Sequence, residues 1–385
     1  MDENMKNTSQ AVASGGVATA EKDAPENPAA QGMSPKAAPV EKGETTGRGD
    51  AAPKAAPAGK TENKDNGALL TVSSSPHISS GRRTRGIMAD VLIALLPACI
   101  AGCVIFGMRS LAVIAACVAS SVATEFVFNL ICKKKQTIGD LSAAVTGLLL
   151  GLNMHAAVPI WQCVLGGVLA IFVVKCIFGG LGCNFANPAI TARVFLLIAF
   201  PAVAGGALPI AMTGGELLTT SATPLVTASG LLSSVPPTSF LDLFLGNHAG
   251  AIGETCIIAL LAGFIYLVVR RVINWYVPAA FVGTVFVCAL LFGGFDAALA
   301  LRQVLSGGLI LGAVFMATDY VTTPITRSGR VIFAVGCGLI TSLIRFFGAY
   351  PEGVSFAILL MNILSPYIEK ATLPRPMGRR REVKK

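Results

Sequence analysis

The run Ile87–Phe106, with the sequence IMADVLIALLPACIAGCVIF, follows the basic cluster Arg82, Arg83 and Arg85 and contains Asp90 as its one charged residue. An α-helix rises about 1.5 Å per residue, so a helix of this length spans the roughly 30 Å apolar core of a lipid bilayer. The run is therefore predicted to be a transmembrane helix, and it begins the apolar part of the chain.

Further apolar runs of similar character follow it along the chain. They lie at about Leu111–Cys132, Leu141–Met154, Pro159–Ile177, Pro188–Ala204, Ala249–Val269, Val277–Phe295, Gln303–Ala317, Val331–Phe347 and Val354–Ile368. In lipid an isolated strand leaves its backbone polar groups unpaired, so these runs are expected to be helices. The predicted fold class is an all-α integral membrane protein with about ten transmembrane helices.

The composition separates the apolar part from a different N-terminal segment. The chain of 385 residues is 53% hydrophobic and 13% charged, whereas soluble domains carry about a quarter charged residues. Residues 1–70 are instead rich in Ala, Pro, Gly, Lys and Glu. Such a segment buries too little apolar surface to fold, so it is predicted to be a disordered cytoplasmic tail.

The basic residues of the apolar part predict its orientation. The net charge of +9 comes from basic residues that are single or in short runs between the apolar segments, which disfavours a nucleic-acid groove and fits cytoplasmic loops. Lys and Arg gather at alternate boundaries, and both termini are therefore predicted to be cytoplasmic. These boundaries carry Arg82–Arg85, Lys133–Lys135, Lys175 with Arg193, Arg270–Arg271, Arg327 with Arg330, and Arg379–Arg381.

The stretch Val194–Val269 contains no Lys or Arg, so its polar part, residues 205–250, is predicted to be an extracytoplasmic loop. This loop separates a first membrane half, 71–204, from a second half, 251–370, each with five spans. Residues 371–385 form a basic cytoplasmic tail. We expect Lys175, Arg193 and Arg345 to extend their charged ends toward the membrane surface and to act as orientation markers.

Two of the spans are predicted to be interrupted. The third run ends at Asn153-Met154-His155 shortly before Pro159, and the eighth ends at Ala317-Thr318-Asp319 shortly before Pro324. Each is short and is third in its half, which is the pattern of an inverted five-helix repeat with broken helices near the middle. The alternative is that these are tilted helices of ordinary kind.

Acidic residues within or beside the spans are candidates for an ion path. Glu125 lies well inside the second run, while Asp140 and Asp319 lie near span ends. A buried carboxylate in a membrane is costly, so Glu125 predicts an ion or proton relay for Na+ or H+, with a satisfied interhelical hydrogen bond as the alternative. For Asp140 and Asp319 the alternative is helix capping. The ten Cys include no C-x-x-C pair, and neither a metal site nor a catalytic residue is predicted.

Two polar loops carry groups suited to a ligand. The Gly-rich loop 179–188 contains Asn184 and Asn187, whose amides can hydrogen-bond a planar ligand. The extracytoplasmic loop contains the hydroxyl run Thr219–Thr223 around Ser221. Both patterns are also ordinary turn chemistry.

Several separate motifs occur together in one order. They are Ser75-Pro76-His77, Asn184-Phe185-Ala186-Asn187-Pro188-Ala189, Ser221-Ala222-Thr223-Pro224-Leu225, Phe315-Met316-Ala317-Thr318-Asp319-Tyr320, and Tyr350-Pro351-Glu352-Gly353-Val354 with Met361-Asn362. From Ser75 to Pro376 the sequence resembles RnfD, a membrane protein of the Rnf ion-translocating electron-transport complex. More distantly it is similar to NqrB, the related membrane protein of the sodium-pumping NADH:quinone oxidoreductase.

The resemblance implies two flavins. In that family a Thr bears FMN through a phosphoester bond made by a flavin-attaching transferase, and the matching residue is Thr223. Two neighbours depart from the pattern: Ser221 stands where Gly is common, and Leu217 where an acidic residue is common. The family also binds riboflavin non-covalently on the cytoplasmic side, which the resemblance places near Asn184 and Asn187.

The function implied is that of a flavin-carrying subunit in a bacterial cytoplasmic (inner) membrane complex, in which electron transfer between ferredoxin and NAD+ drives Na+ or H+ translocation. Other subunits would carry the ferredoxin and NAD chemistry. One alternative keeps the flavins with quinone as acceptor. Others are a solute channel or transporter without flavin, and a passive scaffold subunit.

Overall fold

Helix α1 (Thr84–Phe106) is the first element of the computed structural model, which describes residues 83–201, 239–246, 248, 250–348 and 353–374. Every regular element in this described part is helical, which confirms the all-α prediction. The predicted tail 1–70, most of the loop 205–250 and most of the segment 371–385 lie outside the described residues.

Four of the described helices are long and apolar enough to cross a membrane. They are α1, α2 (Met108–Ile131), α13 (Arg327–Phe347) and α14 (Val354–Thr372). A fifth span is formed when α11 (Ala297–Leu305) is counted together with the segment Leu309–Met316.

The remaining predicted spans are shorter apolar helices. They are α3 (Ser142–Leu152), Ile160–Cys176, α5 (Pro188–Ala199), α9 (Ile257–Val269) and α10 (Tyr276–Phe292). Each of the ten apolar runs therefore contains helix. A short helix α8 (Phe240–Leu245) lies outside these runs.

The eighth span is interrupted as predicted, although the break lies at residues 306–308 and not at the end near Pro324. Helix α11 ends at Leu305, and the chain resumes as α12 (Leu309–Leu311) after a bend of 63°. From α12 the chain continues into the π-helix η3 (Gly312–Met316). A π-helix also ends the fourth span, where α4 (Ile160–Val168) continues as η2 (Leu169–Cys176). π-Helical segments occur often at functional sites.

The third span is a short helix whose end is covered by the second half. A 3-10 turn η1 (Ile138–Asp140) precedes the 11-residue α3, which ends at Leu152 and has Asn153 as its C-cap. The amide of Ile252 donates to the carbonyl of Met154 at 3.0 Å, and that of Gly253 donates to Leu152 at 2.7 Å. These bonds satisfy carbonyls that a helix end leaves free.

The sixth predicted span began too early. Residues 250–256 are not helical, and α9 begins only at Ile257. Apolar composition extended the prediction to Ala249. In the structure this backbone segment instead supplies hydrogen bonds to the interrupted third span.

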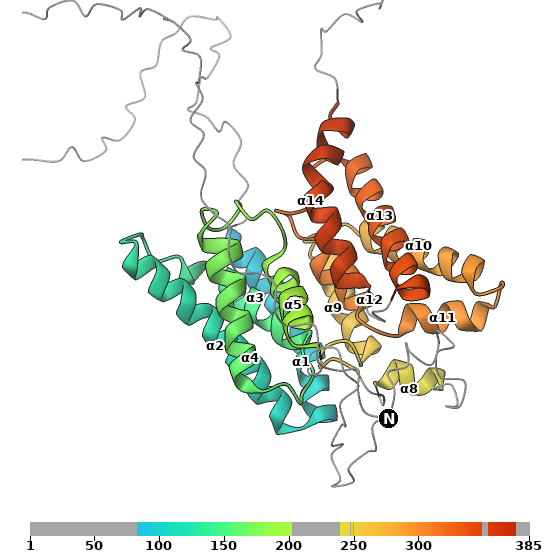
Figure 1. Cartoon of the computed structure of the whole chain (residues 1–385), viewed down its shortest axis with the longest axis horizontal. Coiled ribbons are helices and arrows are strands. Elements are labelled where there is room, and N and C mark those ends of the chain that lie inside the picture. The colour runs from blue at the N-terminus through green and yellow to red at the C-terminus, as the bar shows by residue number, and fades with distance from the viewer. Residues whose placement is uncertain (1–82, 202–238, 247, 249, 349–352, 375–385) are drawn as a thin grey trace, which may run out of the picture. The chain divides into compact units, whose positions relative to one another are not determined.

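The two halves use the same packing scheme. In the first half α2 packs against α3 and α4, and in the second half α10 packs against α11 and α13. The first helices of the halves, α1 and α9, pack against each other, as do the last, α5 and α14. Figure 1 shows the blue-to-green helices of the first half beside the yellow-to-red helices of the second. This correspondence is the one that the predicted repeat requires.

Close backbone approach holds α2 and α3 together. A Cβ atom on Gly147 of α3 would lie 2.7 Å from Val118 Cα and 2.8 Å from Cys117 O. Only glycine permits this distance, and small residues at helix crossings are typical of membrane proteins.

Candidate functional site

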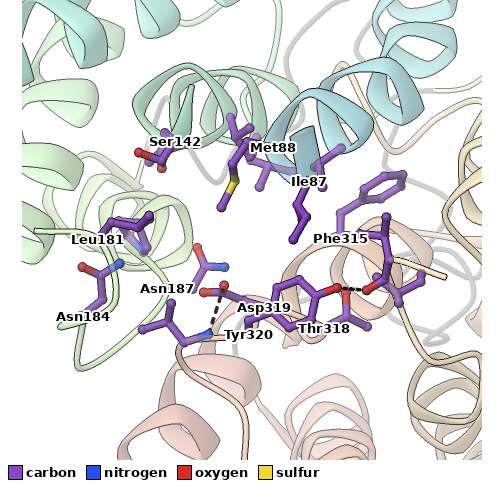
Figure 2. Close-up of a pocket in the computed structure, with 18 of the residues that line it drawn as sticks. Ile87, Met88, Ser142, Leu181, Asn184, Asn187, Phe315, Thr318, Asp319 and Tyr320 are labelled. Atoms are coloured by element: carbon purple, nitrogen blue, oxygen red, sulfur yellow. Dashed lines mark hydrogen bonds between the residues drawn. The ribbon is translucent and has the colours of Figure 1, made fainter. Parts of the chain in front are cut away.

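A pocket lies where the two halves meet, and both interrupted spans contribute to its wall. It contains about 800 Å³ of atom-free space, its open mouth included. Its lining residues come from α1, α3, η2, the 179–188 loop, α9, η3 and the turn after η3 (Figure 2). The lining is mostly aliphatic, with one phenylalanine from η3, Phe315, and Tyr320 from the turn.

Polar side chains enter this apolar lining from separate parts of the chain. Asn184 and Asn187 come from the 179–188 loop, and Thr318 and Asp319 come from the turn after η3 (Figure 2). Lys175 also lines it. The pocket therefore brings together Asn184, Asn187 and Asp319, to which the sequence alone assigned two different roles.

Asn187 begins helix α5 as well as lining the pocket. Its Oδ1 accepts hydrogen bonds from the amides of Ala189 at 3.1 Å and Ile190 at 3.4 Å, and Pro188 occupies the first helical position. Asparagine followed by proline is a strong helix start because the side chain replaces missing backbone partners. The cap uses the oxygen of the amide, so its NH2 group is the part suited to a ligand.

Asn184 presents a different feature. Its Oδ1 is buried and has no hydrogen-bond partner within the described residues. A buried acceptor without a partner is uncommon in native structures. An occupant of the pocket with a hydrogen-bond donor would satisfy it.

Asp319 lies in the turn between η3 and α13. Its Oδ1 accepts from the amide of Val321 at 3.4 Å, and its Oδ2 accepts from Thr322 Oγ1 at 3.2 Å. Burial raises the pKa of the Asp319 carboxyl above its ordinary value. The carboxyl thus stabilises its own turn and also lines the pocket, whereas the residue that caps α13 is Thr326.

Glu125 forms a buried ion pair that sequence analysis did not predict. Its Oε1 lies 2.8 Å from the ammonium of Lys175, and each of these two residues is 2% exposed. Thr137 Oγ1 donates to the same oxygen at 2.6 Å. The prediction that Lys175 reaches the membrane surface was wrong, because Glu125 compensates its charge inside the bundle.

The ion pair connects Glu125 with Asp140. Lys175 Nζ donates to Ser142 Oγ at 2.6 Å, and Ser142 Oγ donates to Asp140 Oδ1 at 2.6 Å. The amide of Ser142 donates to the same Asp140 oxygen at 3.0 Å, so Asp140 also binds the first residue of α3. Sequence reasoning missed the roles of Lys175 and Ser142 in this network. For Lys175 the available signal was a lysine inside an apolar run.

The other two presumed orientation markers are also buried. Arg193 is 6% exposed and donates from Nη1 to the side-chain oxygen of Asn153, where α3 ends. Arg345 is 4% exposed and donates to the carbonyls of Gln303 and Ser306, where α11 ends. The expectation that they extend to the surface was wrong, because each places its charge at the C-terminal end of a helix in an interrupted span, and helix C-terminal ends attract cations.

The two residues of the predicted covalent site, Thr223 and Ser221, lie outside the described residues. The attachment of FMN at Thr223 therefore stays a prediction.

Comparison with known proteins places the chain among membrane electron-transfer proteins. The sequence model of the NQR2, RnfD, RnfE family matches residues 71–378. The Na(+)-translocating ferredoxin:NAD(+) oxidoreductase complex of Acetobacterium woodii contains a subunit, designated D, to which the chain is 47% identical over 312 residues. The match covers 80% of this chain and 95% of that protein.

Two further relatives, with the same designation in their own complexes, are similar over comparable lengths. The one from the proton-translocating ferredoxin:NAD(+) oxidoreductase complex of Clostridium ljungdahlii is 38% identical over 327 residues, covering 81% of this chain and 97% of that protein. The one from the ion-translocating oxidoreductase complex of Stutzerimonas stutzeri is 37% identical over 326 residues, covering 76% and 92%.

Proposed function

The chain belongs to the NQR2, RnfD, RnfE family, and from this premise we propose that it is a flavin-carrying membrane subunit of an ion-translocating ferredoxin:NAD+ oxidoreductase. The observation that carries the proposal is the pocket between the interrupted spans, in a chain whose relatives are named as subunits of such complexes. Its partners would be the other subunits of the complex in a bacterial cytoplasmic membrane.

The pocket has the chemistry for a non-covalent flavin such as riboflavin. Ligand pockets combine apolar walls with a few placed polar groups, and this one has a mostly aliphatic wall that also carries Asn184, Asn187 and Asp319. The Asn184 oxygen, which has no partner within the described residues, would accept a hydrogen bond from a donor group of the flavin ring. The NH2 group of Asn187 would donate a hydrogen bond to an acceptor on the same ring. When bound, a flavin supplies reversible electron transfer, which the side chains of the pocket do not provide.

The apolar wall has its own role in this proposal. Side chains of α1, α3 and η3 would hold the ring flat and exclude water from it. In such surroundings the few polar contacts act with greater strength than in water. The protein therefore orients the cofactor and sets its electrostatic environment, while the cofactor carries the redox chemistry.

A second flavin, FMN, is proposed as a phosphoester of Thr223. The support is the motif Ser221-Ala222-Thr223-Pro224-Leu225 and its resemblance to the family's attachment site. A covalent link keeps the cofactor in place through repeated redox cycles. The partner implied is a flavin-attaching transferase acting on the side predicted to be extracytoplasmic.

The ion path is proposed to include Glu125, Asp140 and Asp319. Glu125 and Asp140 belong to one hydrogen-bonded network, and Asp319 lies on the wall of the adjoining pocket. One relative is named for Na+ and another for protons. The translocated ion is therefore proposed as Na+ or H+.

The proposed reaction is tested on the complex purified through a tag on this chain. We expect reduction of NAD+ with reduced ferredoxin and accumulation of Na+ or H+ in proteoliposomes that contain the complex. A complex that reduces ubiquinone with NADH and has no ferredoxin-dependent activity would instead support the quinone alternative. A colourless preparation without flavin would refute the proposal.

A further inference from the structure

The ammonium of Lys175 lies between two environments. On one side it bonds to Glu125 Oε1 at 2.8 Å and to Ser142 Oγ at 2.6 Å. On the other side Lys175 is part of the pocket wall. An ammonium group has three donors, so the two bonds leave a third donor for an occupant of the pocket.

Glu125 is incompletely satisfied. Its Oε1 accepts from both Lys175 and Thr137, whereas its Oε2 is buried and has no hydrogen-bond partner within the described residues. A buried carboxylate oxygen without a partner points to a ligand that the oxygen can bind, which is a proton or a small cation.

The charges of this pair depend strongly on each other. Because both residues are 2% exposed, loss of either partner's charge leaves the other one uncompensated in a medium of low dielectric constant. Moving the ammonium away from Glu125 therefore raises the affinity of this carboxylate for another cation.

Lys175 lies on η2 and lines the pocket, so atom-free space adjoins its side chain. The π-helical segment Leu169–Cys176 widens the backbone turn at the end of the fourth span. The lysine side chain has a flexible four-carbon stem, so its ammonium can shift between neighbouring acceptors without a change in the fold.

We propose that Lys175 couples the charge in the pocket to cation binding at Glu125. This inference rests on the proposed function, in which the pocket holds a redox-active ring. An electron supplied by ferredoxin to a ring held in the pocket would attract the ammonium, and Glu125 would then bind one Na+ or H+. Once the electron had passed on to NAD+, Lys175 would return to Glu125 and the cation would be released.

The step balances in charge. One negative charge arrives in the pocket, and one positive charge arrives at Glu125. The other titratable groups near the pair are Asp140, reached through Ser142, and Cys176, which interacts electrostatically with Lys175, Glu125 and Lys134. Asp140 accepts two hydrogen bonds from Ser142 and so remains bound to its own turn.

The test is the reduction potential of the non-covalent flavin in the purified complex, measured by spectroelectrochemical titration at a series of Na+ concentrations and pH values. Uptake of one cation per electron raises the potential by about 59 mV for each tenfold rise in cation activity. Any protonation of the flavin itself adds an equal slope to every variant. The diagnostic quantity is therefore the difference in slope between the wild type and the variants.

We expect Lys175→Met and Glu125→Gln each to lose this slope for the coupled cation. Lys175→Arg retains the positive charge and should keep part of the slope. The matched control is Lys135→Met, which removes an exposed lysine and should keep the full wild-type slope. If Lys175→Met fails to fold, the double variant Lys175→Met/Glu125→Gln removes both charges and serves the same purpose.

The outcomes separate this inference from the proposed function. One outcome is that the complex contains the pocket flavin and that Lys175→Met or the double variant keeps the wild-type slope. This outcome overturns the coupling and leaves the proposed function standing. A complex without a non-covalent flavin refutes the assignment of the pocket, and the coupling with it.

Discussion

Arg193 of α5 donates a hydrogen bond to the side-chain oxygen of Asn153, the C-cap residue of the interrupted helix α3. The Asn153 amide nitrogen in turn donates to the carbonyl of Leu149 at 2.7 Å. A buried arginine thus compensates the end of one interrupted span, as Arg345 does for the carbonyls of the other.

Replacing Arg193 should therefore destabilise the bundle. Arg193→Leu removes a charged hydrogen bond to a buried amide, which we expect to cost about 1.5–3 kcal/mol. Thermal unfolding of the purified complex in detergent measures the effect. The control is Arg109→Leu, because the exposed Arg109 bonds only a loop carbonyl within the described residues, and it should change stability by less than about 1 kcal/mol. Equal losses for the two variants would contradict this role of Arg193.

The contact between α2 and α3 predicts a clash. In Gly147→Ala the new methyl group would lie 2.7 Å from the Val118 backbone, which no side-chain rotation relieves, so we expect a loss of about 1–3 kcal/mol. Gly283→Ala in α10 is the control, since nothing lies within 4 Å of its Cβ position. It should be neutral or stabilising by up to about 1 kcal/mol. An unchanged melting temperature in Gly147→Ala would refute the close packing.

The buried ion pair predicts a non-additive result. Lys175→Met alone leaves Glu125 uncompensated and should cost about 3–5 kcal/mol. The double variant Lys175→Met/Glu125→Gln removes both charges and should be closer to the wild type than Lys175→Met alone. Melting temperatures of the wild type, both single variants and the double variant form the required cycle. Additive losses would show that the two side chains do not interact.

The two asparagines of the pocket predict separable effects on non-covalent flavin. Asn184→Leu removes an acceptor without disturbing a helix, and we expect about fivefold weaker flavin binding at unchanged stability. Asn187→Leu should lower both the flavin affinity and the stability, because it also removes the cap of α5, which is worth about 1 kcal/mol.

Asn187→Asp is the matched variant for the second position. It keeps the oxygen that caps α5 but loses the amide donor, so it should weaken flavin binding while leaving the melting temperature near that of the wild type. Acid-extractable flavin per mole of complex is the measurement. Wild-type content in both Asn184→Leu and Asn187→Asp would exclude this flavin site.

The spans could be predicted because their composition alone distinguishes them. Asn153 also indicated where the third span ends, whereas the eighth span was expected to be interrupted near Pro324 and breaks instead at residues 306–308. The start of α9 was placed too early, because residues 250–256 contain a single charged residue, Glu254, yet are not helical and form hydrogen bonds to the end of α3. Composition does not distinguish an apolar helix from an apolar loop that is buried among helices.

The candidate site was predicted only as separate residues. Asn184, Asn187 and Asp319 were each identified, but their meeting in one pocket depends on how the two halves pack. The ion pair joins residues 50 positions apart on different helices, and nothing in the local sequence pairs Lys175 with Glu125. The rule that lysine extends to the membrane surface holds only when no buried carboxylate is within reach.

The central claim is that this chain carries two flavins, one covalent and one in the pocket. The most direct test measures acid-soluble and protein-bound flavin in the same samples of wild-type and Thr223→Val complex, with the bound flavin assigned to this chain by fluorescence on a denaturing gel. The account predicts both flavins in the wild type, and loss of the bound flavin alone in Thr223→Val. A wild-type chain without bound fluorescence, or a complex without acid-soluble flavin, would contradict it.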